Sequence, residues 1–348
     1  MIDSLTSLRL VFALMVFVSH CEMLSPDFNI PIFTEGFVGV EFFFVLSGFV
    51  ISYGYDERFR RGEVNKKNFW VARAARIYPL HWLTLFVVVV LNVYALGSSI
   101  KDELGPFISN LFLCQAYIPL SDYYYSFNSP SWSLCCEQLF YISFPFLVPL
   151  LRHPRRLCSL FLLCAVAVMV GMWLTPPELG KGLWYVNPLT RFPDFLLGMI
   201  VYLCYRRFSS IFCNSRYATW TELLSILVFS GFYLLSTKVP LVCRYSCYYW
   251  LPIAGIIFMF SLQKGFFSRL LSCRFLVFGG EISFGFYMIH LLLFRIFGGL
   301  TRALSFTVSP NLSVLLILIA TFVLSVISYR YFEKPVNRAI KKYIHFRK

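Results

Sequence analysis

The chain has 348 residues, of which 58% are hydrophobic, 19% are aromatic and only 14% are charged, and its mean hydropathy is +0.70. This small number of polar side chains cannot cover the surface of a water-soluble globule of this length. The composition therefore excludes a soluble protein and predicts a surface that faces lipid. The net charge of +14 is of the sign that nucleic-acid-binding proteins carry, but its distribution along the chain indicates another cause.

Hydrophobic stretches of membrane-spanning length recur from one end of the chain to the other. They predict an all-α, polytopic integral membrane bundle of about ten transmembrane helices. We expect a single domain over residues 1–348 without a soluble accessory domain. The first stretch lacks the flanks of a cleavable signal peptide, so we keep it in the fold. The expected spans are residues 8–24, 37–56, 78–97, 132–151, 157–175, 189–205, 219–236, 248–263, 276–297 and 313–332.

The 31 Lys and Arg residues are distributed unevenly over the expected loops. If the amino terminus is cytoplasmic, most of them fall on the cytoplasmic side, as the positive-inside rule requires for an even number of spans with both termini in the cytosol. The basic excess is therefore mainly a consequence of topology, and we expect no nucleic-acid partner. The opposite side receives seven basic residues: Lys101, Lys181, Arg191, Lys238, Arg244, Arg295 and Arg302.

Arg9 and His20 are ionisable residues within the first expected span, where such side chains are costly and usually functional. Eleven residues make about three helical turns, so both side chains share one face, with His20 roughly 16 Å farther along the axis. An imidazole that titrates near neutrality is suited to act as general base toward a hydroxyl. The alternative is a structural histidine bonded to a backbone carbonyl. For the functional case we expect both residues to line one shared cavity.

A long segment, residues 98–130, separates the third expected span from the fourth. Long loops in compact proteins are usually functional or disordered. The apolar part of this segment, residues 107–119, is too short to cross a bilayer, so we expect an interfacial or re-entrant helix there.

The cysteines give no metal-binding signature. Their number, eleven, is odd, and most lie within apolar runs, where a free cysteine behaves as a small hydrophobic side chain. No Cys/His spacing typical of a zinc site occurs, so we expect no metal site. Cys243 and Cys247 lie close together in an expected outer loop, where a disulfide remains an open alternative.

Six segments resemble, in this order, the signature segments of the membrane-bound acyltransferase-3 family. They are LTSLRLVFALMVFVSH (5–20), GVEFFFVLSGFVISYGY (39–55), NFWVARAARIYPLHWLTL (68–85), SPSWSLCCEQLFYISFPFL (129–147), ISFGFYMIHL (282–291) and SYRYFEKPV (328–336). The resemblance spans the whole chain. It implies transfer of an acyl group, usually acetyl, from cytosolic acyl-CoA to a hydroxyl of a carbohydrate or similar acceptor.

The resemblance also assigns family motifs to particular residues. The family's Arg–x10–His motif falls on Arg9 and His20, and its Arg–x–x–Arg motif on Arg73 and Arg76. Its Ser-Gly-Phe turn falls on Ser47, Gly48 and Phe49, and its Trp-Ser…Glu on Trp132, Ser133 and Glu137. Glu41 stands where the family more often has aspartate.

Arg9, Arg73 and Arg76 are the residues that we expect to bind the donor. Coenzyme A carries a pyrophosphate and a ribose phosphate, and guanidinium groups bind phosphates bidentately in a way that lysine does not reproduce. Arg73 and Arg76 are three residues apart on one face of the helix entering the third span, at the expected cytosolic surface. The alternative is that these two are ordinary positive-inside residues.

Glu137 is an intramembrane carboxylate that we expect to face the interior, where it assists His20 by orienting the imidazolium or holds the acceptor hydroxyl. Tyr141 shares its helix face and is expected to cover the acceptor site. A purely structural ion pair with Arg191 is the competing interpretation. Ser47 lacks the GxSxG setting of an acyl-carrying nucleophile, and Ser47-Gly48 fits a close-packing position better. For a further set of residues, a structural role and a role in the acceptor site or around it both stay open. They are Glu41, Trp132, Ser133, Asp194, Glu281, Tyr287, His290 and Glu333.

Together the residues and the resemblance predict a multi-pass O-acyltransferase of the bacterial cytoplasmic membrane. It would use His20 and Glu137 as catalytic residues. Acyl-CoA, most simply acetyl-CoA, would be a co-substrate, and no cofactor would be permanently bound. The expected acceptor is a surface polysaccharide or lipid-linked glycan, and the oligomeric state stays open. The alternative is a transporter or polymerase of lipid-linked glycans, although the chain shows neither repeat symmetry nor paired half-helices.

Overall fold

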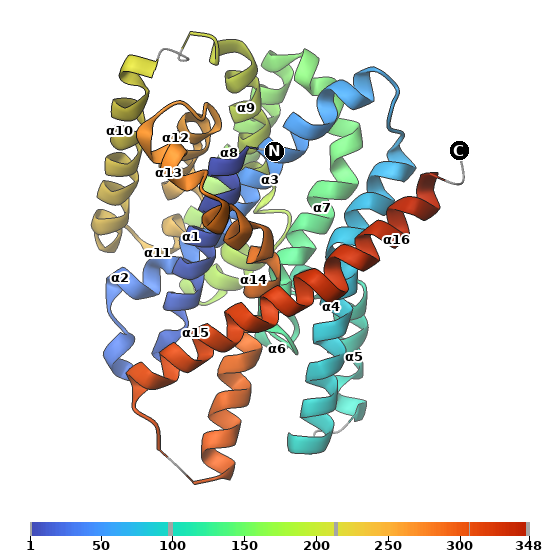
Figure 1. Cartoon of the computed structure of the whole chain (residues 1–348), viewed down its shortest axis with the longest axis vertical. Coiled ribbons are helices and arrows are strands. Elements are labelled where there is room, and N and C mark those ends of the chain that lie inside the picture. Colours follow the sequence, from blue (N-terminus) through green and yellow to red (C-terminus); the bar gives the residue numbers. More distant parts are fainter. Residues whose placement is uncertain (1, 97–99, 212–214, 306, 346–348) are drawn as a thin grey trace.

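A computed structural model of the protein describes residues 2–96, 100–211, 215–305 and 307–345. Within these ranges the chain forms helices and turns without a strand, which confirms the all-α prediction. Eight helices in the described part of the chain are long and apolar enough to cross a membrane, which confirms a polytopic bundle. Both chain ends lie in the upper part of Figure 1, and their assignment to the cytosol stays a prediction from the charge distribution.

All ten expected spans correspond to helices. Eight belong to the long apolar segments, and the other two, α9 and α12, have 17 and 12 residues. At 1.5 Å per residue, these two helices are shorter than the roughly 30 Å hydrocarbon core. The helices are α1 (Asp3–Ser19), α3 (Val38–Arg60), α4 (Lys66–Leu96), α7 (Trp132–Leu147), α8 (Pro154–Leu174), α9 (Phe192–Phe208), α10 (Ser215–Leu235), α12 (Trp250–Ser261), α14 (Arg274–Ala303) and α15 (Pro310–Ile327).

Short helices connect these elements. The helix expected over 107–119 is α5, which covers Ile100–Leu111 and returns along α4 rather than following the predicted boundaries (Figure 1). The His81 ring on α4 bonds the Asn110 carbonyl at 2.8 Å and fixes this contact. Residues 97–99, at the start of the predicted loop, lie outside the described residues. The remaining short helices are α2 (Pro31–Thr34), α6 (Ser121–Tyr124), α11 (Leu241–Arg244), α13 (Phe266–Leu271) and α16 (Lys334–His345).

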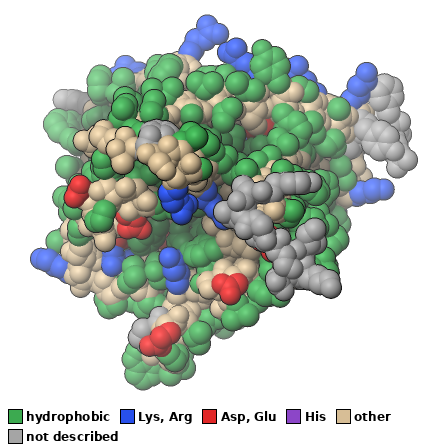
Figure 2. Space-filling view, turned by 90° about the horizontal axis from the view of Figure 1, so that it is seen from below, with side chains coloured by type: hydrophobic (Ala, Val, Ile, Leu, Met, Phe, Trp, Pro, Cys, Tyr) green, Lys and Arg blue, Asp and Glu red, His purple; other side chains and the backbone are tan. Residues whose placement is uncertain are grey.

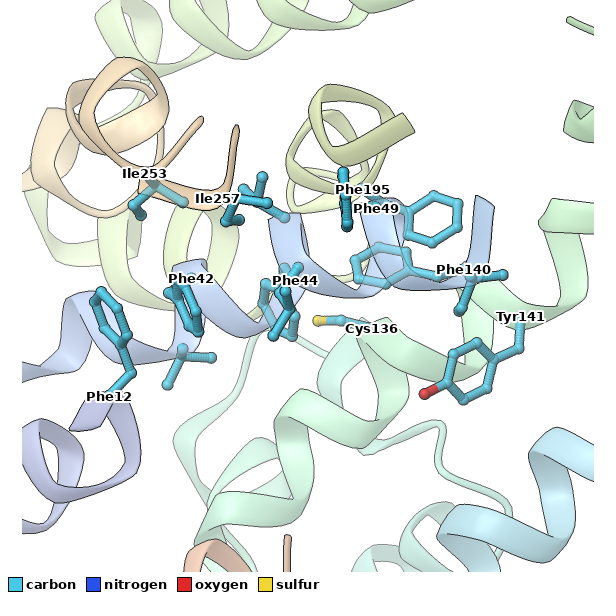
Figure 3. Packing of buried hydrophobic residues seen from close by; sticks show 14 of the residues in the cluster. Phe12, Phe42, Phe44, Phe49, Cys136, Phe140, Tyr141, Phe195, Ile253 and Ile257 are labelled. Carbon is cyan, nitrogen blue, oxygen red and sulfur yellow. The ribbon is translucent and has the colours of Figure 1, made fainter. Parts of the chain in front are cut away.

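Helix α3 forms the centre of the bundle and is buried along most of its length. Its phenylalanines pack between α7 and α9, as Figure 3 shows for Phe44, Phe49, Phe140 and Phe195. The Phe44 and Phe140 ring centroids lie 5.4 Å apart, and Phe140 stacks on Phe195 at 4.8 Å. The phenylalanine run of the second expected span is therefore mainly packing surface.

The closest approach of α3 to α9 occurs at two glycines. A Cβ atom at Gly48 would lie 2.1 Å from the Phe195 carbonyl oxygen, and one at Gly198 would lie 1.9 Å from the Val45 carbonyl oxygen. Only a residue without a side chain fits at such a helix crossing. Gly48 is thus the close-packing position that the sequence predicted, and α3 continues through it unbroken.

We expect Gly48→Ala to destabilise the protein by about 1–3 kcal/mol, because the added methyl forces the two backbones apart. The measurement is thermal unfolding of the detergent-solubilised protein. Gly54→Ala on the same helix is the matched control, since no atom lies within 4 Å of its Cβ position. It should leave stability unchanged or raise it by about 1 kcal/mol through helix propensity. Equal effects of the two substitutions would contradict this account of the crossing.

Candidate active site

A cavity of about 560 Å³, which we call the outer cavity, lies beyond the carboxyl end of α1. Its walls come from that end, from the turn Glu35–Phe37, from the turn before α7, from the π-helical turn Lys181–Val186 and from α11. Figure 2 views the molecule from below and shows a hollow bordered by Lys and Arg side chains, with acidic side chains nearby. By the charge-based topology this is the side opposite the cytosol.

His20 lies at the carboxyl end of α1 and lines the outer cavity. Its Nδ1 is 2.8 Å from the Val16 carbonyl oxygen. Because a carbonyl only accepts, Nδ1 carries the proton of the neutral ring, and Nε2 holds the lone pair. No hydrogen bond from a described residue engages Nε2. This geometry presents the basic nitrogen that proton abstraction from a hydroxyl requires.

His290 on α14 lies directly behind His20. The two ring centroids are 5.1 Å apart, and His290 Nε2 is 3.4 Å from His20 Nδ1. His290 Nδ1 donates to the Tyr287 carbonyl at 2.7 Å, so its Nε2 is an acceptor that faces the proton on His20. His290 therefore supports the ring orientation and tautomer of His20 and does not itself line the outer cavity.

A second, inner cavity of about 40 Å³ lies along α1, farther from the carboxyl end of this helix. It is lined by Arg9, Ser133, Glu137 and Tyr287, among others. Tyr141 donates its hydroxyl proton to Glu137 at 2.5 Å, which fixes the carboxylate. Arg9 and Glu137 have opposite charges and line the same small space. At about 40 Å³ this cavity is far smaller than the outer one.

The structure corrects the expectation of one shared cavity. Arg9 lines the inner cavity and His20 the outer one. Glu137 also belongs to the inner cavity, so it does not contact the His20 ring directly. The separation of Arg9 from His20 follows from α1 itself, because eleven residues of helix place the two side chains about 16 Å apart.

Arg73 and Arg76 on α4 stand near the inner cavity without lining it. Arg73 Nη2 donates to the Tyr55 hydroxyl at 3.3 Å, and its guanidinium lies 5.8 Å from the Tyr141 ring centroid. Arg76 Nη1 forms an ion pair with Glu333 at 3.4 Å. Glu333 is buried at the end of the π-helical turn between α15 and α16. Tyr141 therefore joins Arg73 to Glu137 across a single ring.

Arg191 is fully buried and does not pair with Glu137 as the competing interpretation proposed. Its Nε lies 3.0 Å from an Asp194 oxygen, and its Nη2 lies 3.9 Å from Glu41. Trp250 donates to the other Asp194 oxygen at 2.6 Å. Glu41 and Asp194 are thus parts of a structural charge cluster between α3 and α9, because a buried guanidinium requires a carboxylate partner.

The other predicted site residues divide between the two cavities. Trp132 lines the outer cavity, and Ser133 the inner one. Tyr287 lines both. Ser47 lines neither cavity, so the structure does not bring it to the site. Glu281 is a surface-side partner, since it accepts a hydrogen bond from Tyr329 at 2.6 Å.

Sequence reasoning missed the polar residues of the outer cavity. Glu35 forms an ion pair with Arg244 and accepts a hydrogen bond from Tyr249 at 2.7 Å. Lys181 lies 5.3 Å from the Tyr125 ring centroid. Lys181 and Arg244 are two of the few basic residues on the outer side, which was the one available signal. The turns that carry these residues have no sequence periodicity from which their proximity in the fold could be predicted.

The aromatic wall of the outer cavity was missed for the same reason. Tyr185 lies 4.7 Å from Trp132 and 5.1 Å from Tyr245, measured between ring centroids. Burial raises the pKa of the Tyr125, Tyr185 and Tyr245 phenols, so all three stay protonated. They can therefore donate hydrogen bonds to a bound molecule while their rings provide an apolar surface.

The structure also describes the cysteine pair of the outer loop and the arrangement of possible metal ligands. Cys243 and Cys247 are both free thiols, so the open disulfide alternative is wrong. In the described residues no group of three His, Cys, Asp or Glu side chains is arranged to hold a metal ion.

Comparison with known proteins identifies related sequences. The chain is 30% identical over 330 residues to acyltransferase MdmB of Streptomyces mycarofaciens, covering 84% of this chain and 79% of that protein. It is 26% identical to peptidoglycan O-acetyltransferase OatA of Listeria monocytogenes, covering 87% of this chain and 51% of that protein. It is 25% identical to O-acetyltransferase OatA of Staphylococcus aureus, with 87% and 53% covered. The chain thus spans about half the length of these two O-acetyltransferases.

No solved structure matches the chain. The sequence profile of the acyltransferase-3 family, described as an acyltransferase domain, matches residues 2–330, which is nearly the whole chain. This match includes both cavities and all of the helices that line them. The chain therefore belongs to the membrane-bound acyltransferase-3 family.

Proposed function

We propose that this acyltransferase moves an acyl group, most simply acetyl, from cytosolic acyl-CoA to a carbohydrate hydroxyl, with His20 as general base. The observation that carries the proposal is the His20 ring, whose Nδ1 donates to the Val16 carbonyl while the ring lines the outer cavity. In the proposed reaction the acceptor hydroxyl gives its proton to Nε2, and its oxygen attacks the thioester carbonyl. The C–S bond then breaks, and the thiolate takes the proton from His20.

The donor site that we propose is the group of Arg9, Arg73 and Arg76. Arg9 lies in the first half of α1, and Arg73 and Arg76 lie in the first half of α4, near the helix ends that we expect at the cytosolic side. Guanidinium groups suit the phosphates of coenzyme A. The inner cavity would widen to admit the pantetheine arm, which leads along α1 toward His20. Glu137 would act by balancing and orienting Arg9, since both line that cavity.

The acceptor site that we propose is the outer cavity. Trp132, Tyr185 and Tyr245 offer ring faces for the apolar side of a sugar, and neighbouring polar groups suit its hydroxyls. Two relatives are named as O-acetyltransferases, one of them for peptidoglycan, which supports a surface or lipid-linked glycan as acceptor. A bacterial cytoplasmic membrane location fits such an acceptor. Membership of an acyltransferase family argues against the alternative of a glycan transporter or polymerase.

We expect His20→Gln to lower the rate of acyl transfer by about 10²–10⁴-fold, because general-base catalysis contributes an effect of this size. The measurement is transfer of labelled acetyl from acetyl-CoA to envelope glycan in membranes, with protein amounts matched. His153→Gln is the control, since His153 is exposed and lies at the start of α8. Wild-type rates in the His20 variant would remove His20 from the mechanism.

We also expect Arg73→Ala combined with Arg76→Ala to abolish most of the thermal stabilisation that acetyl-CoA gives. A ligand present at about 100 times its Kd stabilises the folded state by about 2.7 kcal/mol. The readout is the ligand-induced shift in Tm of the purified protein rather than Tm itself, because Arg76→Ala also breaks the Glu333 ion pair.

The matched control for the arginine pair is Arg60→Ala combined with Arg61→Ala. These two arginines are exposed and pair with Glu57 on the surface. The control should keep the full acetyl-CoA shift. Loss of the shift in both double variants would indicate nonspecific attraction of an anion, and an unchanged shift in the Arg73 and Arg76 variant would place the donor elsewhere.

A further inference from the structure

The two cavities adjoin at two residues. Val40 on α3 and Tyr287 on α14 line both the outer and the inner cavity, and among the described residues the two linings share no other member. Both side chains are buried, Val40 at 3% and Tyr287 at 8% exposure. They form the wall, here called the partition, that lies between the Arg9 side and the His20 side of the bundle.

Contacts on three sides hold Tyr287 in the partition. Its hydroxyl donates to the Pro130 carbonyl at 3.2 Å, and Pro130 lines the outer cavity. Its ring centroid lies 6.2 Å from that of Phe43, which lines the inner cavity. Its own carbonyl accepts the hydrogen bond from His290 that orients the ring next to His20. Tyr287 thus forms part of the partition and also holds His290, the residue that supports the proposed base His20.

We infer that Tyr287, with Val40, is the residue that keeps water of the outer cavity away from the donor thioester until an acceptor is in place. This inference rests on the proposed function, because it presupposes a thioester on the Arg9 side. An outer cavity of about 560 Å³ is large enough to be water-filled, whereas the inner cavity, at about 40 Å³, is more than ten times smaller. Exclusion of water from a reactive intermediate suppresses its hydrolysis.

Removal of the partition should create a defined side reaction. A water molecule would give its proton to His20 Nε2, and its oxygen would attack the thioester carbonyl. The C–S bond breaks, the thiolate takes the proton from His20, and acetic acid then ionises. Acetyl-CoA and water thus yield acetate, free coenzyme A and one proton, without any oxidant or further reactant.

The experiment measures thiol release from acetyl-CoA by the full-length protein in detergent, without acceptor. We expect Tyr287→Ala to raise this rate by about tenfold or more, because loss of the ring joins the two cavities. Tyr287→Phe keeps the ring and should stay near the wild-type rate. Adding His20→Gln to Tyr287→Ala should return the rate to the background of the protein-free reaction.

The matched control is Tyr202→Ala on α9. Tyr202 is also 8% exposed and also donates its hydroxyl to a buried partner, Asp56, at 2.9 Å, but it lines neither cavity. It should not raise acceptor-free hydrolysis. Val40→Ala, which trims the other side of the partition, is the second variant for the case in which Tyr287→Ala does not fold. No increase in a folded Tyr287→Ala or Val40→Ala protein that still binds acetyl-CoA would overturn the inference.

A second measurement does not depend on the donor. A cysteine placed by Ser133→Cys lies in the inner cavity, and a small charged methanethiosulfonate added to the outer face of intact cells should label it only when Tyr287→Ala is also present. Peptide mass spectrometry separates this site from the native cysteines. Equal labelling with and without Tyr287 would refute the partition. Labelling that appears only with Tyr287→Ala, in a protein that neither binds nor cleaves acetyl-CoA, would confirm the wall and refute the proposed donor.

Discussion

An ionisable side chain inside an apolar helical bundle must have a partner or a water-filled space, because an unpaired charge is costly in a low-dielectric interior. Arg191 meets this constraint with Asp194 and Glu41, Arg76 with Glu333, and Arg244 with Glu35. These ion pairs connect helices that are distant in sequence and so fix the arrangement of the bundle. In the described chain no ion pair engages Arg9 or His20, and both line cavities instead. Arg9 and His20 differ from these paired arginines in that they line the two cavities of the proposed site.

The spacing of Arg9 and His20 along α1 places one residue in each of the two cavities. Arg9 and His20 share one face but lie about 16 Å apart, so one helix serves an inner and an outer cavity. In the proposed function, a phosphate-bearing donor and a glycan acceptor approach from opposite sides without competing for space. The cost is that the reacting groups must meet across a wall, and that wall is formed by Val40 and Tyr287.

The sequence was sufficient to predict what depends on long helices. Hydrophobic length gave the spans, helical periodicity put Tyr141 beside Glu137, and Gly48 was recognised as a close-packing position. Predictions failed where contacts depend on how helices are arranged in space. Periodicity predicts that Arg9 and His20 share one face but contains no information about the side chain of α14 that lies between their cavities. Likewise, only the fold shows that Arg191 meets Asp194, three residues away, rather than Glu137.

The two cavities also differ in the kind of structure that forms them. The inner cavity is lined by residues of α1, α3, α7 and α14, all long packed helices whose positions tolerate little change. Much of the outer cavity is lined by short turns and by α11, where substitutions and insertions disturb packing less. In the proposed function, the donor lies on the rigid side and the acceptor on the irregular side. That assignment predicts that acceptor preference changes through residues such as Lys181 and Tyr245, while His20, carried on α1, keeps its place.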